Sequence, residues 1–426
     1  MKELNKSFDH DMKQFNNETV PATITKPKKT KRNVIIAIGM LMVVVIAVGL
    51  YFFVFKKQAS APTDSEATTN QPEETTKDRL RLIVTGDTIA HDSVNQEAQQ
   101  GDGYEYSDMF GALPAIFANA DLRFCNQATL AGGTEFGVSG YPTFNAPTEL
   151  TRDMQELGCN IINTGSNHTN DYGQDVISSA VQAWEGQPDV FAVAGANANE
   201  SQKQEVRYFE KKGVKFAFVS YTTYSNETAP SSYSVTMYSD KLAKKQLAEA
   251  RSKADVVIAS MRWGTEYSPE INTKQKTIAK DVVNYGADII LGHGPHVLQS
   301  VEKLTLDDNR EAYVWYSLGN FLNTQLQPEA LFNVIGVMDF DTKTKKLTDI
   351  SYLPIYMHYE WTAEEKANGD LFKRKNLKLY TFDQAKEYIN KSQLDTSLEA
   401  QDERIKSTLQ KLIDVDTLKV EDYLQS

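Results

Sequence analysis

The chain has 426 residues, of which 41% are hydrophobic, and it carries a formal net charge of −12. This length suits one large folded domain, and the negative charge opposes nucleic-acid binding because an acidic surface repels a polyanion. The sequence has no phosphate-binding glycine loop and no nucleophile elbow, which argues against nucleotide-dependent and serine-hydrolase chemistry.

The N-terminal part contains an uninterrupted apolar stretch at residues 34–55 without a charged residue. It reaches the about 20 residues that an α-helix needs to cross a bilayer, so we expect a single transmembrane helix in the plasma membrane. Basic residues are denser before it than after it, which predicts a cytoplasmic tail at 1–33 and an extracellular remainder. A cleaved signal peptide is the alternative, but its apolar region is typically only about 7 to 15 residues long.

Residues 56–78 are rich in Thr, Ser, Pro and Glu and nearly lack large apolar side chains, which predicts a disordered stalk. We expect the extracellular domain at 79–360 and a helical appendage at 361–426. Leu398, Ile405 and Leu409 share one face of a predicted helix at 397–415. This helix is expected to pack on the domain, and binding of a partner is the alternative.

Between residues 79 and 301 the sequence alternates apolar strands with amphipathic helices. The predicted strands are at 80–85, 122–125, 161–164, 190–194, 214–220, 256–260 and 288–291, and the predicted helices at 113–118, 147–157, 176–184, 241–253 and 274–285. Such alternation is typical of an α/β fold with a mainly parallel sheet. Further strands at 311–317, 332–339 and 347–353 follow with little helix between them, which predicts a second, antiparallel sheet.

Polar side chains follow three of these strands at the point where each strand ends. Asp87 follows the first strand, Asn167 and His168 follow the third, and His293 and His296 follow the strand at 288–291. Ligands of open α/β sheets bind outside the carboxyl ends of the strands, so we expect these side chains to face one crevice.

These residue types are suited to metal chemistry. We predict Asp87, Asn167, His293 and His296 as ligands of a divalent transition metal (Zn, Mn or Fe), and His168 as the acid that protonates a leaving group. For Asp87 and Asn167 the alternative is the capping of turns. His293 and His296 are expected in a short exposed loop.

Two features lie outside this pattern. Cys125 and Cys159 are the only cysteines, and each lies beside an apolar strand, so we expect them to be unpaired core residues. An exported protein could instead pair them. His358 lies among aromatic residues and is expected to be packed or solvated rather than functional.

Seven short blocks of the sequence together resemble one known family. They are Gly86-Asp87, Ala120-Asp121-Leu122 with Asn126, 167–173, 263–267, 286–288, Gly292-His293 with 295–297, and 316–321. In this order, over about residues 80–355, they are similar to the CapA/PgsA family of poly-γ-glutamate capsule synthesis proteins. The resemblance implies a four-layer, calcineurin-like metallophosphoesterase fold in a domain anchored outside the membrane of a Gram-positive cell.

The same resemblance implies a role, partners and further site residues. The role is in the synthesis or export of poly-γ-glutamate or another anionic polymer, together with membrane-bound capsule synthase subunits. Residues expected to bind substrate or to support the site are His91, Asn126, Trp263, Glu266 and Asn320.

Three positions depart from the family's pattern. Ala128 stands where the family has a glutamate, Arg262 where it has a histidine, and Gly294 where it has a second histidine. We therefore expect at most one metal ion rather than two. A guanidinium keeps its proton and cannot bind metal, but Arg262 could grip a carboxylate or phosphate of a ligand, and pairing with Glu266 or Asp87 is the alternative.

Two functions remain open at this point. The first is an accessory or polymer-binding component of a cell-surface poly-γ-glutamate system with little or no catalysis. The second is a metal-dependent hydrolase or transferase that acts on phosphoester, ester or amide bonds at the outer face of the membrane. Ala128 and Arg262 favour the first.

Overall fold

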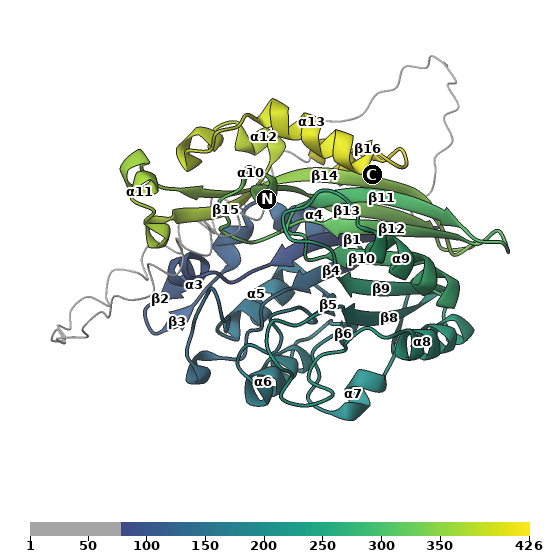
Figure 1. The fold of residues 1–426 in the computed structure, drawn as a ribbon. Helices are drawn as coiled ribbons and strands as arrows, with labels where there is room; N and C mark the ends of the chain where they lie inside the picture. The colour runs from purple at the N-terminus through teal and green to yellow at the C-terminus, as the bar shows by residue number, and fades with distance from the viewer. Residues whose placement is uncertain (1–77) are drawn as a thin grey trace, which may run out of the picture. The chain divides into compact units, whose positions relative to one another are not determined.

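The computed structural model describes residues 78–426, which fall within one compact unit (Figure 1). The expected cytoplasmic tail and transmembrane helix, and all but the last residue of the expected stalk, lie outside these residues. Within the range 78–426, no helix is both long enough and apolar enough to span a membrane.

The first sheet is mixed and contains the N-terminal strand of the described chain. Its order is β15-β14-β13-β1-β4-β5-β6, with the short β16 beside β14. The bounds are β1 Arg79–Thr88, β4 Leu122–Gln127, β5 Ile161–Asn163, β6 Ala192–Ala194, β13 Phe332–Asp341, β14 Lys346–Glu360, β15 Lys375–Thr381 and β16 Asp416–Thr417. Strands β1, β4, β5 and β6 are parallel, whereas β13, β14 and β15 join them as antiparallel neighbours.

The second sheet has the order β11-β12-β10-β9-β8-β7. Its strands are β7 Arg207–Lys211, β8 Val214–Thr222, β9 Val256–Arg262, β10 Ile289–His293, β11 Leu298–Thr305 and β12 Glu311–Leu318. The four central strands are parallel, and the outer β7 and β11 are antiparallel to their neighbours. The small hairpin β2 Gln99–Gln100 and β3 Gly103–Tyr104 stands apart from both sheets.

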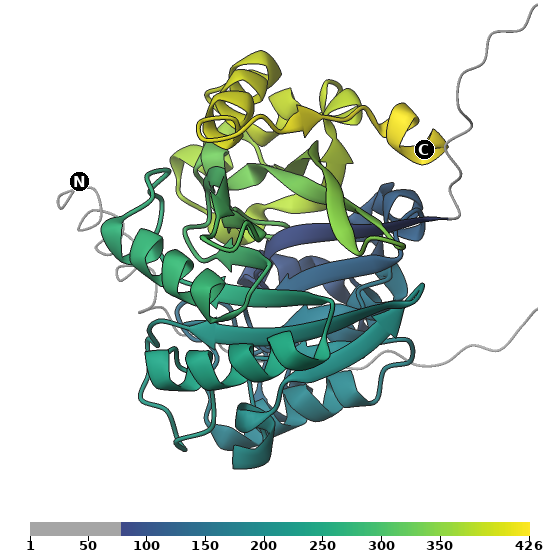
Figure 2. The same ribbon diagram turned by 90° about the vertical axis from the view of Figure 1, so that its right-hand side faces the viewer.

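Helices lie outside the two sheets (Figures 1 and 2). The α-helices are α3 Asp92–Ala98, α4 Leu113–Ala118, α5 Glu149–Leu157, α6 Gln174–Glu185, α7 Glu200–Gln204, α8 Asp240–Lys253, α9 Thr273–Tyr285, α10 Pro328–Leu331, α11 Ala363–Ala367, α12 Phe382–Ala385, α13 Leu398–Leu409 and α14 Val420–Gln425. Short 3-10 turns are η2 Ser107–Phe110, η3 Thr134–Phe136, η4 Leu371–Lys373 and η5 Ile389–Ser392. Helix α9 shows local control of these boundaries, since Asn272 and Gln275 form a capping box at its start and Gly286 follows its end.

The strands of the second sheet bury both faces, and each face enters a different core. In β9, Ile258 belongs to the large cluster between the sheets together with Phe124 of β4. Its neighbour Val257 belongs to a second cluster with Leu247 of α8 and Ile278 of α9. This alternation follows from the two-residue period of a strand, and it explains why the strand reads as one continuous apolar run.

The structure confirms the α/β fold with a parallel core in each sheet and corrects two expectations. The late strands do not form a separate antiparallel sheet, because β13 and β14 extend the first sheet beside β1 and β12 joins the second sheet beside β10. The segment 361–426 contributes the strands β15 and β16 as well as helices, and Ile405 and Tyr423 are buried in the main core. This segment is therefore part of the same compact unit.

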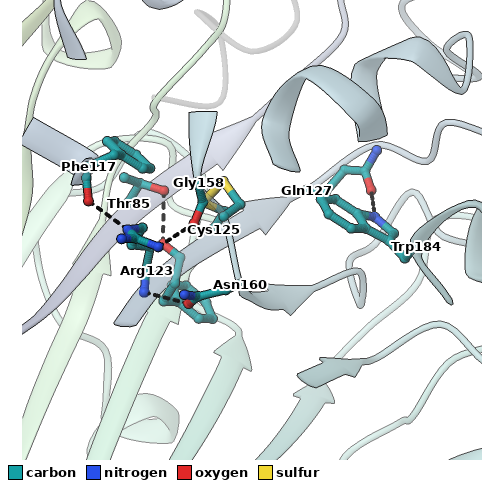
Figure 3. The surroundings of a disulfide bond; sticks show 10 residues. Thr85, Phe117, Arg123, Cys125, Gln127, Gly158, Asn160 and Trp184 are labelled. Carbon is teal, nitrogen blue, oxygen red and sulfur yellow. Dashed lines mark hydrogen bonds between the residues drawn. A yellow bond between two sulfur atoms is a disulfide. The ribbon is translucent and has the colours of Figure 1, made fainter. Parts of the chain in front are cut away.

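The expectation of unpaired cysteines was wrong. Cys125 and Cys159 form a disulfide, with their Cα atoms 5.7 Å apart (Figure 3). The bond joins β4 to Cys159, which lies two residues before β5 begins, and β4 and β5 are neighbouring parallel strands. The sequence shows two cysteines near strands but not that the strands are neighbours.

Hydrogen bonds also join β4 to the residues before β5, close to the disulfide (Figure 3). The backbone NH of Arg123 donates to the Asn160 side chain at 2.8 Å, and the Arg123 guanidinium donates to the carbonyl of Gly158 at 3.3 Å. The disulfide thus lies immediately before the β4 residue Asn126, which faces the candidate site.

Removing the disulfide is expected to destabilise the domain. The bond closes a loop of 34 residues, for which the loss of chain entropy in the unfolded state gives about 2 to 4 kcal/mol. The double variant Cys125→Ala/Cys159→Ala should therefore lower the free energy of unfolding in urea by that amount. Reductant should destabilise the wild type in the same way and leave the double variant unchanged; equal stability of all samples would contradict this prediction.

Candidate functional site

The polar side chains at the ends of the central strands meet where the two sheets come together. Strands β1, β4 and β5 of the first sheet contribute Asp87, Asn126 and Asn163, and strands β9 and β10 of the second contribute Arg262 and His293. The expectation that these strand ends face one site is confirmed.

Asp87 is the central carboxylate, and it is 1% exposed. The backbone reaches this position through a close approach at Gly86, where an added Cβ would lie only 2.2 Å from the carbonyl oxygen of Gly319. The NH of Asp87 donates to that same oxygen at 3.0 Å, and the side-chain NH of Asn126 donates to Asp87 Oδ1. Glycine at position 86 therefore allows the backbone to approach Gly319 closely and the carboxylate of Asp87 to lie between the two sheets.

His293 is completely buried at the end of β10, and both sheets hold it. Its Nε2 lies 2.8 Å from the hydroxyl of Ser260 and 3.2 Å from the amide nitrogen of Asn163. Its Nδ1 has no hydrogen-bond partner and lies 3.8 Å from Asp87 Oδ1. Burial lowers the pKa of His293 to about 4, so its imidazole is neutral at physiological pH.

His296 lies on the other side of Asp87. Its Nδ1 is 2.8 Å from Asp87 Oδ2 and 3.1 Å from the side-chain oxygen of Asn320. The contact with Asp87 lacks hydrogen-bond geometry, and Asp87 Oδ2 has no hydrogen-bond partner. His296 has a positive φ of 62°, as does Tyr267 (58°), whose NH donates to the carbonyl of Pro295. Such backbone conformations are strained and occur often at functional sites.

The two histidines are not in an exposed loop, as the sequence suggested. His293 is 0% exposed and His296 is 8% exposed. The loop after β10 turns inward because its polar side chains find partners on the first sheet. The sequence does not show that this loop and the first sheet are neighbours.

Several charges act on the buried carboxylate. Burial by itself raises the pKa of Asp87, but the contact with His296, the nearby His293 and, last, the positive charge of Arg262 outweigh burial, and the net pKa is lowered. Asp87 is therefore ionised at physiological pH, and the site holds a buried negative charge.

Arg262 is the positive group of the site, and its guanidinium is occupied by protein groups. Its Nε donates to Asn167 Oδ1 at 3.0 Å, and its Nη2 donates to Glu266 Oε1 at 3.0 Å and to the Tyr224 hydroxyl. The side chain is 2% exposed, whereas that of Glu266 is 41% exposed. The structure thus favours the ion-pair alternative for Arg262 over a clamp on a ligand.

The same contacts change the interpretation of Asn167. This residue was predicted as a metal ligand, but its oxygen accepts the hydrogen bond from Arg262 and its NH₂ donates to Asn226 at 3.2 Å. The oxygen that a metal would need is therefore already engaged.

His168 forms a dyad with Asp171 beside this cluster. Its Nδ1 lies 2.8 Å from Asp171 Oδ2, and its side chain is 15% exposed. The ring packs edge-on against Phe144, with centroids 4.7 Å apart. The other ring nitrogen, Nε2, lies 3.3 Å from the side-chain NH₂ of Asn226. A carboxylate on Nδ1 is the usual way to orient an acid–base histidine, so the acid role stays a prediction in which Nε2 must exchange Asn226 for a substrate.

The remaining predicted residues mainly support the site. His91 Nδ1 accepts a hydrogen bond from the NH of Thr324, and burial lowers the pKa of His91 well below its usual value. The indole of Trp263 donates to the carbonyl of Tyr316 at 2.8 Å and is 1% exposed, which gives it a packing role. Ala128 packs with Ile89 and Phe144 in a small apolar cluster.

Sequence reasoning missed Asn163, Asp171, Ser220 and Ser260. Asn163 links Asn126 to His293, and Ser220 of β8 donates to Asn163. Their common signal is a polar residue at the end of an apolar strand or in the loop that follows, which also marked Asp87.

The side chains present do not fit a two-ion metal centre. Across residues 78–426, no three His, Cys, Asp or Glu side chains are placed to hold a metal ion. Two ligand-type atoms that remain available in the site are Asp87 Oδ2 and His293 Nδ1, which are buried and lack hydrogen-bond partners. Asn167 is engaged by Arg262, and position 128 carries no carboxylate.

Comparison with known proteins gives a consistent result. A family model described as bacterial capsule synthesis protein PGA_cap matches residues 81–325, which is more than half of the chain. The capsule biosynthesis protein CapA of Bacillus anthracis is 27% identical over 310 residues, or 70% of each chain. The PGA biosynthesis protein CapA of Bacillus subtilis (strain 168) is 24% identical over 323 residues, or 73% of this chain and 77% of the relative.

Similar solved structures are more distant. A phosphatase from Mycoplasma pneumoniae has a TM-score of 0.42 and 13% identity and covers 65% of this chain and 94% of its own. A 5′-nucleotidase from Candida albicans SC5314 has a TM-score of 0.36 and 11% identity, with 64% and 51% covered.

The burial of His293 predicts acid sensitivity. Its pKa falls from 6.5 in the unfolded chain to about 4 in the folded one, so the unfolded chain binds this proton more tightly. The stability should be unaffected by this group above about pH 6.5 and should decrease by roughly 2 to 3 kcal/mol as the pH falls toward 4.5.

The matched variant for this prediction is His293→Gln in metal-free protein. It should have a lower stability at pH 7.5 and a smaller decrease toward pH 4.5, as measured by urea unfolding. His358→Gln serves as a control, because burial also lowers the pKa of His358 but this residue lies outside the site. An unchanged pH slope in His293→Gln would show that this imidazole does not titrate as expected.

Proposed function

The chain belongs to the bacterial capsule synthesis protein PGA_cap family, and on this basis we propose that it is an accessory component of poly-γ-glutamate synthesis or export at the cell surface. The names of its relatives, a capsule biosynthesis protein and a PGA biosynthesis protein, support this role. The proposed partners are the polymer, or another anionic polymer, and membrane-bound synthase subunits.

The observation that carries the accessory role is the state of the site. A buried carboxylate and two imidazoles are present, but Arg262 engages Asn167 and Ala128 belongs to an apolar cluster. A two-ion hydrolase needs acidic and neutral ligands around both ions. Here one such position carries a positive charge and another a methyl group, which supports a role with little or no catalysis.

The finer fold and the topology are part of the proposal. The two stacked sheets between outer helices are compatible with the four-layer, calcineurin-like arrangement that the family resemblance implies. We propose that residues 34–55 form an uncleaved single-pass anchor in the plasma membrane of a Gram-positive cell. The support for this anchor is the apolar length and the charge asymmetry of the sequence.

One observation favours a second candidate, a hydrolase or transferase with a single metal ion (Mn, Zn or Fe). Asp87 Oδ2 and His293 Nδ1 are buried and lack hydrogen-bond partners, although such atoms are normally satisfied. The His168–Asp171 dyad near Asn167 could then supply an acid for an ester or amide leaving group. This candidate requires turnover, whereas the accessory role does not.

Cells that lack the chromosomal copy of this gene provide the test. Wild type, Asp87→Asn and His168→Gln are returned on a plasmid, and surface poly-γ-glutamate is quantified after acid hydrolysis as glutamate. The accessory role predicts that His168→Gln retains more than half of the polymer, because no proton transfer is needed. A loss of at least tenfold in His168→Gln with a normal protein level would favour the hydrolase, and no loss in the gene deletion itself would reject both.

The anchor is tested by protease treatment of intact protoplasts. The described domain should be digested, and an N-terminal tag should remain protected with a fragment that contains residues 1–55. Survival of the full-length protein, while a known surface protein is digested, would reject the proposed topology.

A further inference from the structure

Gly294 is a position at which the site allows no side chain. Its φ is +104°, and a Cβ added there would lie 2.2 Å from Arg262 Nη1 and 2.5 Å from Arg262 Cζ. The guanidinium therefore fills the volume that any other residue at position 294 would enter.

The guanidinium cannot move away easily. It is fixed by Asn167 and Glu266, its Nη1 donates to the carbonyl of Trp263 at 3.3 Å, and its Cζ lies 4.5 Å from the centre of the Tyr224 ring. These contacts come from three separate loops, so a shift of the side chain would break several hydrogen bonds of a buried charge.

We propose that Arg262 and Gly294 act as one unit, in which the guanidinium is the permanent cation of the site and excludes a divalent metal ion from the side of Asn167 and Glu266. The guanidinium forms an ion pair with Glu266, in which Arg262 Nη2 lies 3.0 Å from Glu266 Oε1. A cation fixed at this place compensates the charge of the Glu266 carboxylate, and it repels a second cation at short range. The inference goes beyond the accessory role and does not depend on it.

The first consequence concerns metal binding by the purified full-length chain in detergent. Mn²⁺ and Zn²⁺ are titrated by calorimetry into wild type, Arg262→Met and Arg262→Lys. Methionine removes the charge, frees the Asn167 oxygen and breaks the ion pair with Glu266, which then keeps only the hydrogen bond from the Tyr224 hydroxyl. Binding of at least one of the two ions should therefore become at least tenfold tighter or gain one equivalent. Arg262→Lys keeps a positive charge and should behave as the wild type.

An added Asp87→Asn substitution locates the new ion. In the Arg262→Met background it should abolish the gain, because the carboxylate of Asp87 is the central acidic group. Equal stoichiometry and affinity within twofold for wild type and Arg262→Met would overturn the proposal. Arg262→Gln replaces Arg262→Met if the latter does not fold, with the same expectations.

The second consequence is a steric coupling that is measured without metal. Gly294→Ala should lower the melting temperature strongly in the wild type and much less in Arg262→Ala. In Arg262→Ala the contacts that a Cβ would make with Nη1, Cδ and Cζ of Arg262 are absent, so only the backbone strain remains. Gly213 is the matched control, since its φ is also positive (+76°) but an added Cβ meets nothing within 4 Å.

Gly213→Ala should therefore lower the melting temperature by the same amount in both backgrounds. If Gly294→Ala also lowered the melting temperature by the same amount in both backgrounds, Arg262 and Gly294 would not act as a unit and the proposal would fail. Neither measurement involves the polymer, so failure of the accessory role would leave these results unaffected.

Discussion

The buried carboxylate of Asp87 is the constraint on which the rest of the site depends. An ionised group without solvent costs several kcal/mol unless charges and hydrogen bonds compensate for it. The compensation here comes from both sheets: Asn126 from β4, His296 after β10 and Arg262 from β9. The contact between two otherwise apolar sheets is therefore polar at these strand ends.

This constraint extends outward through shared partners. Asn163 connects Asn126 to His293, and Ser260 holds the same imidazole from β9. The disulfide lies directly behind this network, since Cys125 immediately precedes Asn126. A covalent link between β4 and its neighbour thus sits next to the residue that donates to Asp87, and the stability of the domain and the geometry of the site share one strand.

Two positions of the site, 262 and 294, are matched to each other. Arg262 takes a position beside Asn167 and Glu266, and Gly294 provides the space for it. The guanidinium of Arg262 donates to Asn167, Glu266, Tyr224 and the carbonyl of Trp263, which favours a structural role for this charge. The acidic surface of the protein and an anionic polymer repel each other, so contact with such a polymer requires local recognition rather than general attraction.

The sequence by itself determined the α/β class, most of the strands and helices, and the residues at the strand ends. Apolar periodicity and the polar residues that interrupt it are local signals, and they sufficed to select Asp87, His293 and His296 as residues at strand ends that face one another. Residues such as Asn163 and Asp171 were missed, because an asparagine or aspartate near a strand end is also a common turn residue.

Only the tertiary structure decided which of these residues meet. The pairing of Cys125 with Cys159, the inward turn of the loop that carries His296, and the contact between Arg262 and Gly294 each join segments that are distant in sequence. Their reason is the adjacency of strands within a sheet and of one sheet to the other. That adjacency arises from long-range packing, which no local pattern of residues contains.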